Sequence, residues 1–142
     1  MSFFKQFENS ISIDKSDENV FSITPSKDYF VGNTPHGGYL TAIMQKALSL
    51  SMPHQHVINS NTLYLDRTEP KEIMIHVKKI RESRGSSVGQ VTLIQDDKSR
   101  CMMTGICSDF NHMKGVNDLE TLPSKMFEED RDSFISLNFD KK

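Results

Sequence analysis

The sequence predicts an α+β fold in which one long helix is wrapped by a curved antiparallel β-sheet. Apolar residues recur at helical spacing from Leu40 to Leu48 and form the one long stripe of this kind. Segments of alternating polar and apolar residues follow, and short polar turns join them. A single amphipathic helix can bury its stripe only against the concave face of such a sheet, so the two are expected to form two layers.

The length and composition of the chain favour one globular domain. Residues 1–115 are expected to form that domain, and residues 116–142 an acidic tail or linker with a short helix around 123–134. Hydrophobic residues make up 36% and charged residues 25% of the 142 positions, and the net charge of −2 gives no reason to expect nucleic acid as a partner. Without a long apolar run or a signal segment, the chain is expected to be cytoplasmic and to have no membrane partner.

The elements can be predicted in chain order. Alternation over Asn19 to Thr24 predicts a first strand, and the stretch from Gly32 to Gly38, with its proline and three glycines, predicts a loop. The helix follows, and Pro53 ends it. Four strands are then expected, over residues 59–66, 73–81, 87–95 and 101–110. Residues 82–85 and 96–99 are predicted turns between the later strands.

The cysteines and two histidines are given structural rather than chemical roles. Cys101 and Cys107 lie six residues apart on one predicted strand. At ~3.3 Å per residue this is about 20 Å, beyond disulfide reach, so both are predicted to be reduced and buried. His54 and His56 are expected to be exposed loop histidines, and no Cys/His cluster with zinc-like spacing predicts a metal site.

The loop before the helix resembles a known family. Gly32–Leu40 (Gly-Asn-Thr-Pro-His-Gly-Gly-Tyr-Leu) is similar to the helix start of the hotdog thioesterase-like superfamily, above all to the N-terminal half of double-hotdog acyl-CoA thioesterases of the thioesterase II type. The stretches Tyr64–Arg67, Arg81–Arg84 and Val91–Asp96 also resemble that family, and the likeness covers roughly Val20 to Phe110. It implies a hotdog fold whose copies pair into one continuous sheet, with acyl-CoA sites between them. The chain is therefore expected to form a homodimer or tetramer, or to be half of a double-hotdog protein.

The start of the helix is the predicted reaction centre. Thioester hydrolysis needs donors for the negative charge on the carbonyl oxygen, and the first N–H groups of a helix supply them. Gly37 and Gly38 let a substrate approach the backbone closely, or they only make the turn into the helix. His36 is predicted either to donate a hydrogen bond to the thioester or to be an ordinary loop histidine, and Asn33 either to bind water or to favour the turn.

Water activation is expected to differ from that of the relatives. His-Gly-Gly relatives commonly carry a carboxylate where this chain has Gln45, and residues 31–57 contain no Asp or Glu. Gln45 shares a helix edge with Gly38, so it can hold a water but cannot accept its proton. A base is then expected from the partner strand, with Asp66 as the nearest candidate and Thr68 as a water-orienting hydroxyl; a surface salt bridge from Asp66 to Arg67 is the alternative.

A cluster of cationic residues at the end of one predicted strand is a candidate binding site for coenzyme A. Lys79, Arg81 and Arg84 could bind the phosphates of coenzyme A, or they are solvated cations. No cofactor is expected, because coenzyme A enters as part of the substrate. The sequence thus predicts an acyl-CoA thioesterase, with a non-catalytic acyl-CoA-binding or structural hotdog domain as the alternative. The missing helix carboxylate favours the alternative, and the Gly-Gly helix start favours the enzyme. A hydratase or dehydratase ranks third.

Overall fold

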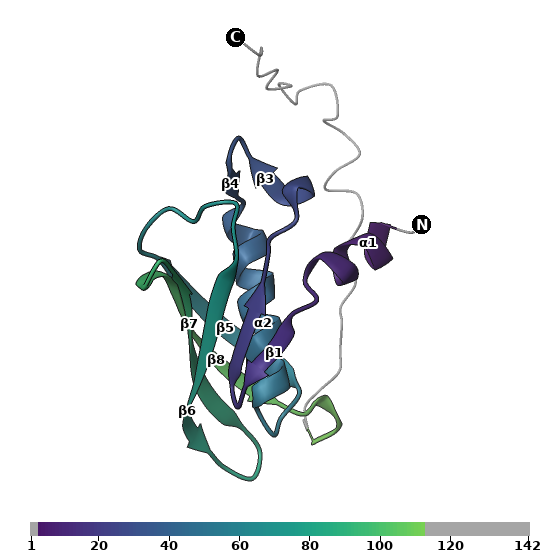
Figure 1. Cartoon of the computed structure of the whole chain (residues 1–142). Helices are drawn as coiled ribbons and strands as arrows, with labels where there is room; N and C mark the ends of the chain where they lie inside the picture. Colours follow the sequence, from purple (N-terminus) through teal and green to yellow (C-terminus); the bar gives the residue numbers. More distant parts are fainter. Residues whose placement is uncertain (1–2, 113–142) are drawn as a thin grey trace, which may run out of the picture.

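The computed structural model describes residues 3–112 of the chain (Figure 1). The predicted tail over 116–142, with its short helix, lies outside the described residues. The elements follow in the order α1 (Phe3–Ser10), β1 (Asp14–Asp17), β2 (Val20–Ile23), the 3-10 turn η1 (Lys27–Tyr29), β3 (Phe30–Val31), β4 (Thr34–Pro35), α2 (Gly37–Ser51), β5 (His56–Tyr64), β6 (Ile73–Glu82), β7 (Ser87–Gln95), β8 (Lys98–Ser108) and the 3-10 turn η2 (Phe110–His112).

One antiparallel sheet holds six of the strands, in the order β1-β2-β6-β7-β8-β5. Helix α2 lies along one face of the sheet and contacts β5, β6, β7 and β8 (Figure 1). The short pair β3–β4 stands above the start of α2. This arrangement confirms the predicted α+β hotdog fold with one long helix against an antiparallel sheet. Within the described residues, no helix is long and apolar enough to cross a membrane.

The apolar stripe predicted for the helix faces the sheet. Helix α2 begins directly after His36 and ends at Ser51, where Met52 caps it just before Pro53. Proline cannot continue a helix, so this end follows from the sequence. The buried residues of α2 are Tyr39, Leu40, Ile43, Met44, Ala47 and Leu48. Together with apolar residues of β2, β6, β7 and β8 they form the core of the domain.

Two paired glycines let the helix approach the sheet closely. Gly89 on β7 and Gly105 on β8 lie opposite each other. A Cβ atom on either one would overlap the side chain of Leu48, and one on Gly89 would also overlap Met52. Leu48 therefore fills a depression in the sheet that only residues without a side chain can leave open.

The structure confirms several local predictions and corrects others. Asp96 and Asp97 have φ values of 53° and 58°, as a tight hairpin turn between β7 and β8 requires. Cys101 and Cys107 are free and buried, as predicted. The prediction for His54 is wrong: it is 7% exposed, and its ring nitrogens lie 3.2 Å from the Ser87 hydroxyl and 3.3 Å from a backbone carbonyl oxygen. Helix α1 and strand β1 were not predicted.

His56 also differs from the expected loop histidine. It begins strand β5, its side chain is 40% exposed, and its ring stacks on Phe110 with the ring centroids 4.2 Å apart. Both histidines thus lie at the end of the domain at which α2 finishes, where His54 is buried and His56 is partly exposed at the start of a strand.

Candidate functional site

His36 caps the start of α2. Its Nδ1 accepts a hydrogen bond from the Gly38 N–H at 3.1 Å, and the residue itself is exposed. A neutral imidazole that accepts through Nδ1 carries its proton on Nε2. The capping bond therefore leaves His36 with an exposed N–H donor at the positive end of the helix. It also means that the Gly38 amide, predicted to be free for a ligand, already has a partner in this structure.

Gly37 occupies the first helical position and faces Tyr64 of β5. Its N–H has no acceptor within the helix, because the first turn lacks the preceding carbonyls. Its carbonyl oxygen accepts a hydrogen bond of 2.8 Å from the Tyr64 hydroxyl. A Cβ on Gly37 would lie 3.0 Å from Cζ of Tyr64. Gly37 therefore begins the helix with an N–H that has no acceptor within it, and its missing side chain leaves room for the Tyr64 ring.

A row of polar contacts, the polar seam, continues from Tyr64 along the contact of α2 with β5. The Tyr64 hydroxyl lies 2.7 Å from Oγ1 of Thr41, which in turn contacts the Thr62 hydroxyl at 3.2 Å. One turn further along α2, Nε2 of Gln45 donates to the Ser60 hydroxyl at 2.8 Å. This bond uses the amide nitrogen of Gln45 and leaves its oxygen as an acceptor. Gln45 thus lies on the same edge of α2 as Thr41, where both side chains face β5.

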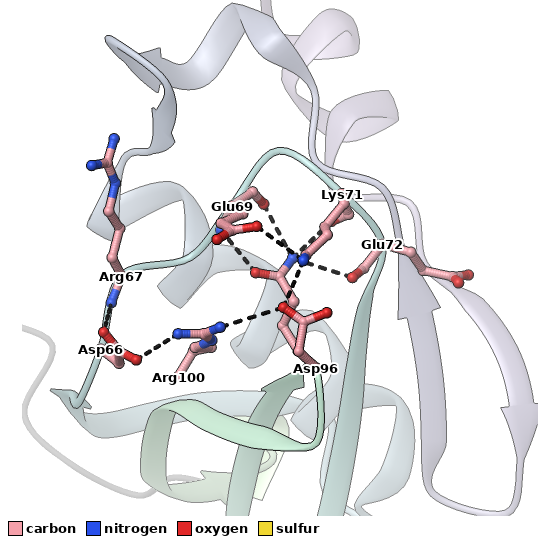
Figure 2. A network of polar contacts seen from close by, with 8 residues as sticks. Asp66, Arg67, Glu69, Lys71, Glu72, Asp96 and Arg100 are labelled. Atoms are coloured by element: carbon pink, nitrogen blue, oxygen red, sulfur yellow. Dashed lines mark hydrogen bonds and ion pairs between the residues drawn. The ribbon is translucent and has the colours of Figure 1, made fainter.

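Asp66, the predicted base, forms an ion pair with a different arginine from the one expected. Its carboxylate lies 2.5 Å from Nη1 of Arg100, which is 8% exposed, and it also accepts a bond from the backbone N–H of Arg67 (Figure 2). The Arg67 amide and then Arg100 lower the pKa of Asp66. A carboxylate stabilised in its ionised form is a weaker proton acceptor. These contacts argue against Asp66 as the base within one chain.

The segment between β5 and β6 is held by buried Gln95. Its side-chain oxygen accepts from the Glu69 N–H at 2.8 Å, and its nitrogen donates to three backbone carbonyls of residues 69–72 at 3.1–3.2 Å (Figure 2). Nζ of Lys71 forms ion pairs with the carboxylates of Glu69 at 2.9 Å and Asp96 at 2.6 Å. Thr68 is only 1% exposed within this segment, so its hydroxyl does not face bulk water as the predicted water-orienting group would.

Arg67 points away from this network, toward the β3–β4 pair (Figure 2). Its Nε donates to the Thr34 hydroxyl at 2.6 Å, two residues before His36. Asn33, the predicted water ligand or turn residue, is exposed in the turn between β3 and β4, next to Gly32, which has a φ of 62°. Arg67 is therefore a cation near the helix start, whereas the sequence suggested it only as a salt-bridge partner of Asp66.

The predicted cation cluster of Lys79, Arg81 and Arg84 lies at the opposite end of the domain from the start of α2. The Arg84 carbonyl contacts His54, just beyond the end of α2. Across the sheet, Ser87 at the β6–β7 turn pairs with Cys107 of β8, which in turn pairs with Val57 of β5. The start of α2 instead contacts Tyr64, at the other end of β5. Seven strand residues separate Val57 from Tyr64, about 23 Å at ~3.3 Å each. Lys79, Arg81 and Arg84 are exposed there, and Lys79 lies 3.5 Å from Glu82.

A hollow of about 400 Å³ opens beside Gln45 on the outer side of α2. Its lining residues come from α1, α2, the start of β5 and η2: Phe7, Ile11, Ala42, Gln45, Lys46, Ser49, Gln55, His56, Val57 and Phe110. In the described part of the chain, no group of three or more His, Cys, Asp or Glu residues could hold a metal ion.

Comparison with known proteins places this geometry in a family. Residues 25–108 match the model of the acyl-CoA thioesterase N-terminal domain. The structure is similar to a candidate thioesterase II from Thermobifida fusca (18% identity, TM-score 0.73, covering 80% of this chain and 43% of that one). It is also similar to the TesB protein of Mycobacterium avium subspecies paratuberculosis (18% identity, TM-score 0.66, covering 78% of this chain and 45% of that one). A Streptococcus mutans protein solved with acetyl-CoA bound matches at 18% identity and TM-score 0.61, over 68% of this chain and 87% of that one.

No curated protein sequence matches this chain. The chain spans less than half the length of the two thioesterase relatives from Thermobifida and Mycobacterium, and at 18% identity the structural likeness shows the fold. The family match, however, covers more than half of the chain, including the helix start, the β5–β6 segment and the strand that ends in Gln95. The chain therefore belongs to the acyl-CoA thioesterase N-terminal domain family.

Proposed function

We propose that this chain is one hotdog unit of an acyl-CoA thioesterase whose reaction centre forms between two such units. The observation that carries the proposal is the start of α2, where the unbonded Gly37 N–H and the exposed Nε2–H of His36 lie at the positive end of the central helix. Preorganised donors of this kind stabilise the negative charge that develops on a thioester carbonyl. Family membership supplies the class of substrate.

The free edge of β5 supports pairing with a second unit. Strand β5 is the last strand of the sheet, so one row of its N–H and C=O groups has no partner within the described chain. Its nine residues, His56–Tyr64, include no lysine, arginine, aspartate, glutamate or proline. Proteins usually blunt an exposed edge with such residues. A long edge without them favours pairing with the β5 edge of another hotdog unit, in a homodimer or higher assembly.

Antiparallel pairing of two β5 strands would also bring the separated candidate residues together. The strand directions are opposed, so the end of β5 at which α2 starts in one unit lies beside the end at which α2 finishes in the other. The Lys79, Arg81 and Arg84 cluster of the second unit then comes to the side of the helix start in the first. In this proposal the phosphates of coenzyme A bind cations of one unit while the thioester carbonyl binds the other.

The proposed reaction is hydrolysis of the thioester by water. The carbonyl oxygen accepts hydrogen bonds from Gly37 N–H and His36 Nε2–H, and the free side-chain oxygen of Gln45 orients the water. The water oxygen bonds to the carbonyl carbon, the C–S bond breaks, and the thiolate of coenzyme A takes up a proton. Within one unit, Gln45 is an amide and the pKa of Asp66 is lowered, so in this proposal a carboxylate of the paired unit accepts the proton of the water.

Release of free thiol from acyl-CoA tests this proposal with a matched pair of variants. Gly37→Ala and Gly37→Pro both add a Cβ near Tyr64, but only the proline removes the N–H, and proline is accepted at the first helical position. Loss of one such donor lowers kcat by about 10²–10³-fold. Turnover should therefore be far lower in the proline variant than in the alanine variant. Equal turnover in the two variants would remove the amide from the mechanism.

A second candidate is an acyl-CoA-binding unit without turnover of its own. Gln45 at the place of a carboxylate, together with the ion pair of Asp66, favours it. The two functions separate when binding and thiol release are measured on the same sample. Saturable acyl-CoA binding without thiol release from the assembled protein supports the binding unit, whereas release that saturates with the same affinity supports the enzyme.

A further inference from the structure

We propose that helix α1 forms a wall of the acyl-chain site, and that Phe7 and Ile11 on that wall set the length of acyl chain that the site accepts. This inference rests on the proposed function and goes beyond it. It assigns selectivity for acyl-chain length to a segment that precedes residues 25–108, the part of the chain that matches the family model. In Figure 1, α1 stands at the side of the domain just before β1, and residues of α1 and α2 line the same hollow.

The hollow beside Gln45 has the lining that an acyl chain requires. Phe7 and Ile11 line it from the α1 side, Ala42 from α2, Val57 from β5 and Phe110 from η2. Its volume of about 400 Å³ lies within the ~300–1,000 Å³ usual for small-molecule sites. These five side chains are apolar, so they offer a hydrocarbon chain a place away from water.

The charge of the lining argues against the phosphates of coenzyme A as the occupant. Among the described residues that line the hollow, Lys46 is the only lysine or arginine, and it is exposed. Phosphate sites usually combine several cationic or N–H donors. The hydrocarbon part of the substrate therefore fits this lining better than the nucleotide part.

The hollow also lies at a suitable distance from the proposed carbonyl site. Ala42 follows Gly38 by four residues, about 6 Å along a helix at ~1.5 Å per residue. The hollow then extends along α2 to Ser49, about 10 Å further. Gln45 lies between these ends and also belongs to the polar seam. A chain whose carbonyl is held at the helix start can thus run along α2 past Gln45 into the hollow.

Helix α1 is fixed in place by contacts with the start of α2. The hydroxyl of Tyr39, in the first turn of α2, donates to the Ser10 carbonyl at 2.6 Å and accepts from the Ser26 N–H at 3.0 Å. The Tyr39 ring stacks on Tyr29 at 4.8 Å, and Tyr29 meets the edge of Phe7 at 5.5 Å. The wall is therefore attached to the same helical turn that presents the Gly37 amide, and these contacts set its position relative to that amide.

Binding of a series of saturated acyl-CoAs of increasing length tests the inference. Each buried methylene contributes ~0.8 kcal/mol, about a fourfold change in Kd. The affinity of the wild-type protein should rise by about that factor for each methylene and level off where the hollow is full. Phe7→Ala should move the levelling point to longer chains, and Phe7→Trp to shorter ones. Ile11→Ala should act in the same direction as Phe7→Ala.

Phe4→Ala is the matched control, because Phe4 lies on the same helix, is 70% exposed and does not line the hollow. It should leave the levelling point unchanged. The opposite shifts of the two Phe7 variants separate a specificity effect from a general loss of folding, which would weaken all chain lengths alike.

The outcomes distinguish this inference from the proposed function. If acyl-CoAs bind but the levelling point stays the same in both Phe7 variants and in Ile11→Ala, the inference is overturned and the proposed function stands. If affinity does not depend on chain length, the hollow does not hold the acyl chain, and the inference is again overturned. If no acyl-CoA binds the wild-type protein, both are overturned.

Discussion

Replacing His36 by alanine and by asparagine separates its two roles at the helix start. The His36 ring caps α2 through the Gly38 N–H, and the same bond leaves an exposed Nε2–H donor. Asparagine is among the best capping residues and can accept the Gly38 bond, but it does not place a donor where Nε2 lies. Alanine provides neither function. Any difference between the two variants in stability therefore reports capping, and any loss of activity that they share reports the donor.

The expected magnitudes differ enough to be measured independently. Loss of the cap in His36→Ala should lower the free energy of unfolding by about 1 kcal/mol, while His36→Asn should stay within a few tenths of wild type. Both variants should lose about 10²–10³-fold in kcat if Nε2–H stabilises the oxyanion. Urea unfolding and thiol release on the same preparations give the two numbers. Full turnover by His36→Asn would refute the donor role and leave His36 as a cap alone.

Three further predictions concern packing and ionisation. Gly105→Ala should cost about 1–3 kcal/mol of unfolding free energy by overpacking the core, whereas Gly85→Ala, where the new Cβ meets open space, should be nearly neutral in the same urea titration. The pKa of Asp66 is lowered from 3.8 in the folded protein. Ionised Asp66 therefore stabilises the fold above about pH 3.8, and this contribution is lost as the pH falls through the lower pKa of the folded state. In urea titrations, Asp66→Asn should lose less unfolding free energy than wild type between pH 6 and pH 3. Burial raises the pKa of both Cys101 and Cys107, so a thiol reagent at neutral pH should modify them slowly in the native protein and rapidly in urea; equal rates would contradict their burial.

The elements of the central domain could be predicted because their patterns are local. The apolar stripe of α2 and the stop at Pro53 lie within one stretch, and the hairpin at Asp96 and Asp97 carries its own turn chemistry. Helix α1 was missed because none of its residues is buried and its position depends on contacts with Tyr39, far along the chain. The spacing of Phe4, Phe7 and Ile11 is the sequence signal that could have revealed it.

The candidate site was harder to predict because its contacts join distant segments. Alternation in β5 suggested a strand but not which face meets the helix; the structure turns the hydroxyls of Thr62 and Tyr64 toward α2 and leaves Leu63 57% exposed. Asp66 has an arginine as its sequence neighbour, yet its ion pair is with Arg100, 34 residues away. Only the pairing of β5 with β8 places these two groups together.

The central claim is that the N–H groups at the start of α2 bind the thioester carbonyl. Titration of the ¹⁵N-labelled protein with a non-hydrolysable acyl-CoA analogue tests this directly through the backbone amide shifts. We expect the amide of Gly37 to show the largest change, and the amides of Ala42 and Gln45 to shift only when the analogue carries an acyl chain. Shifts confined to residues 79–84, with the Gly37 amide unmoved at saturation, would contradict carbonyl binding at the start of α2.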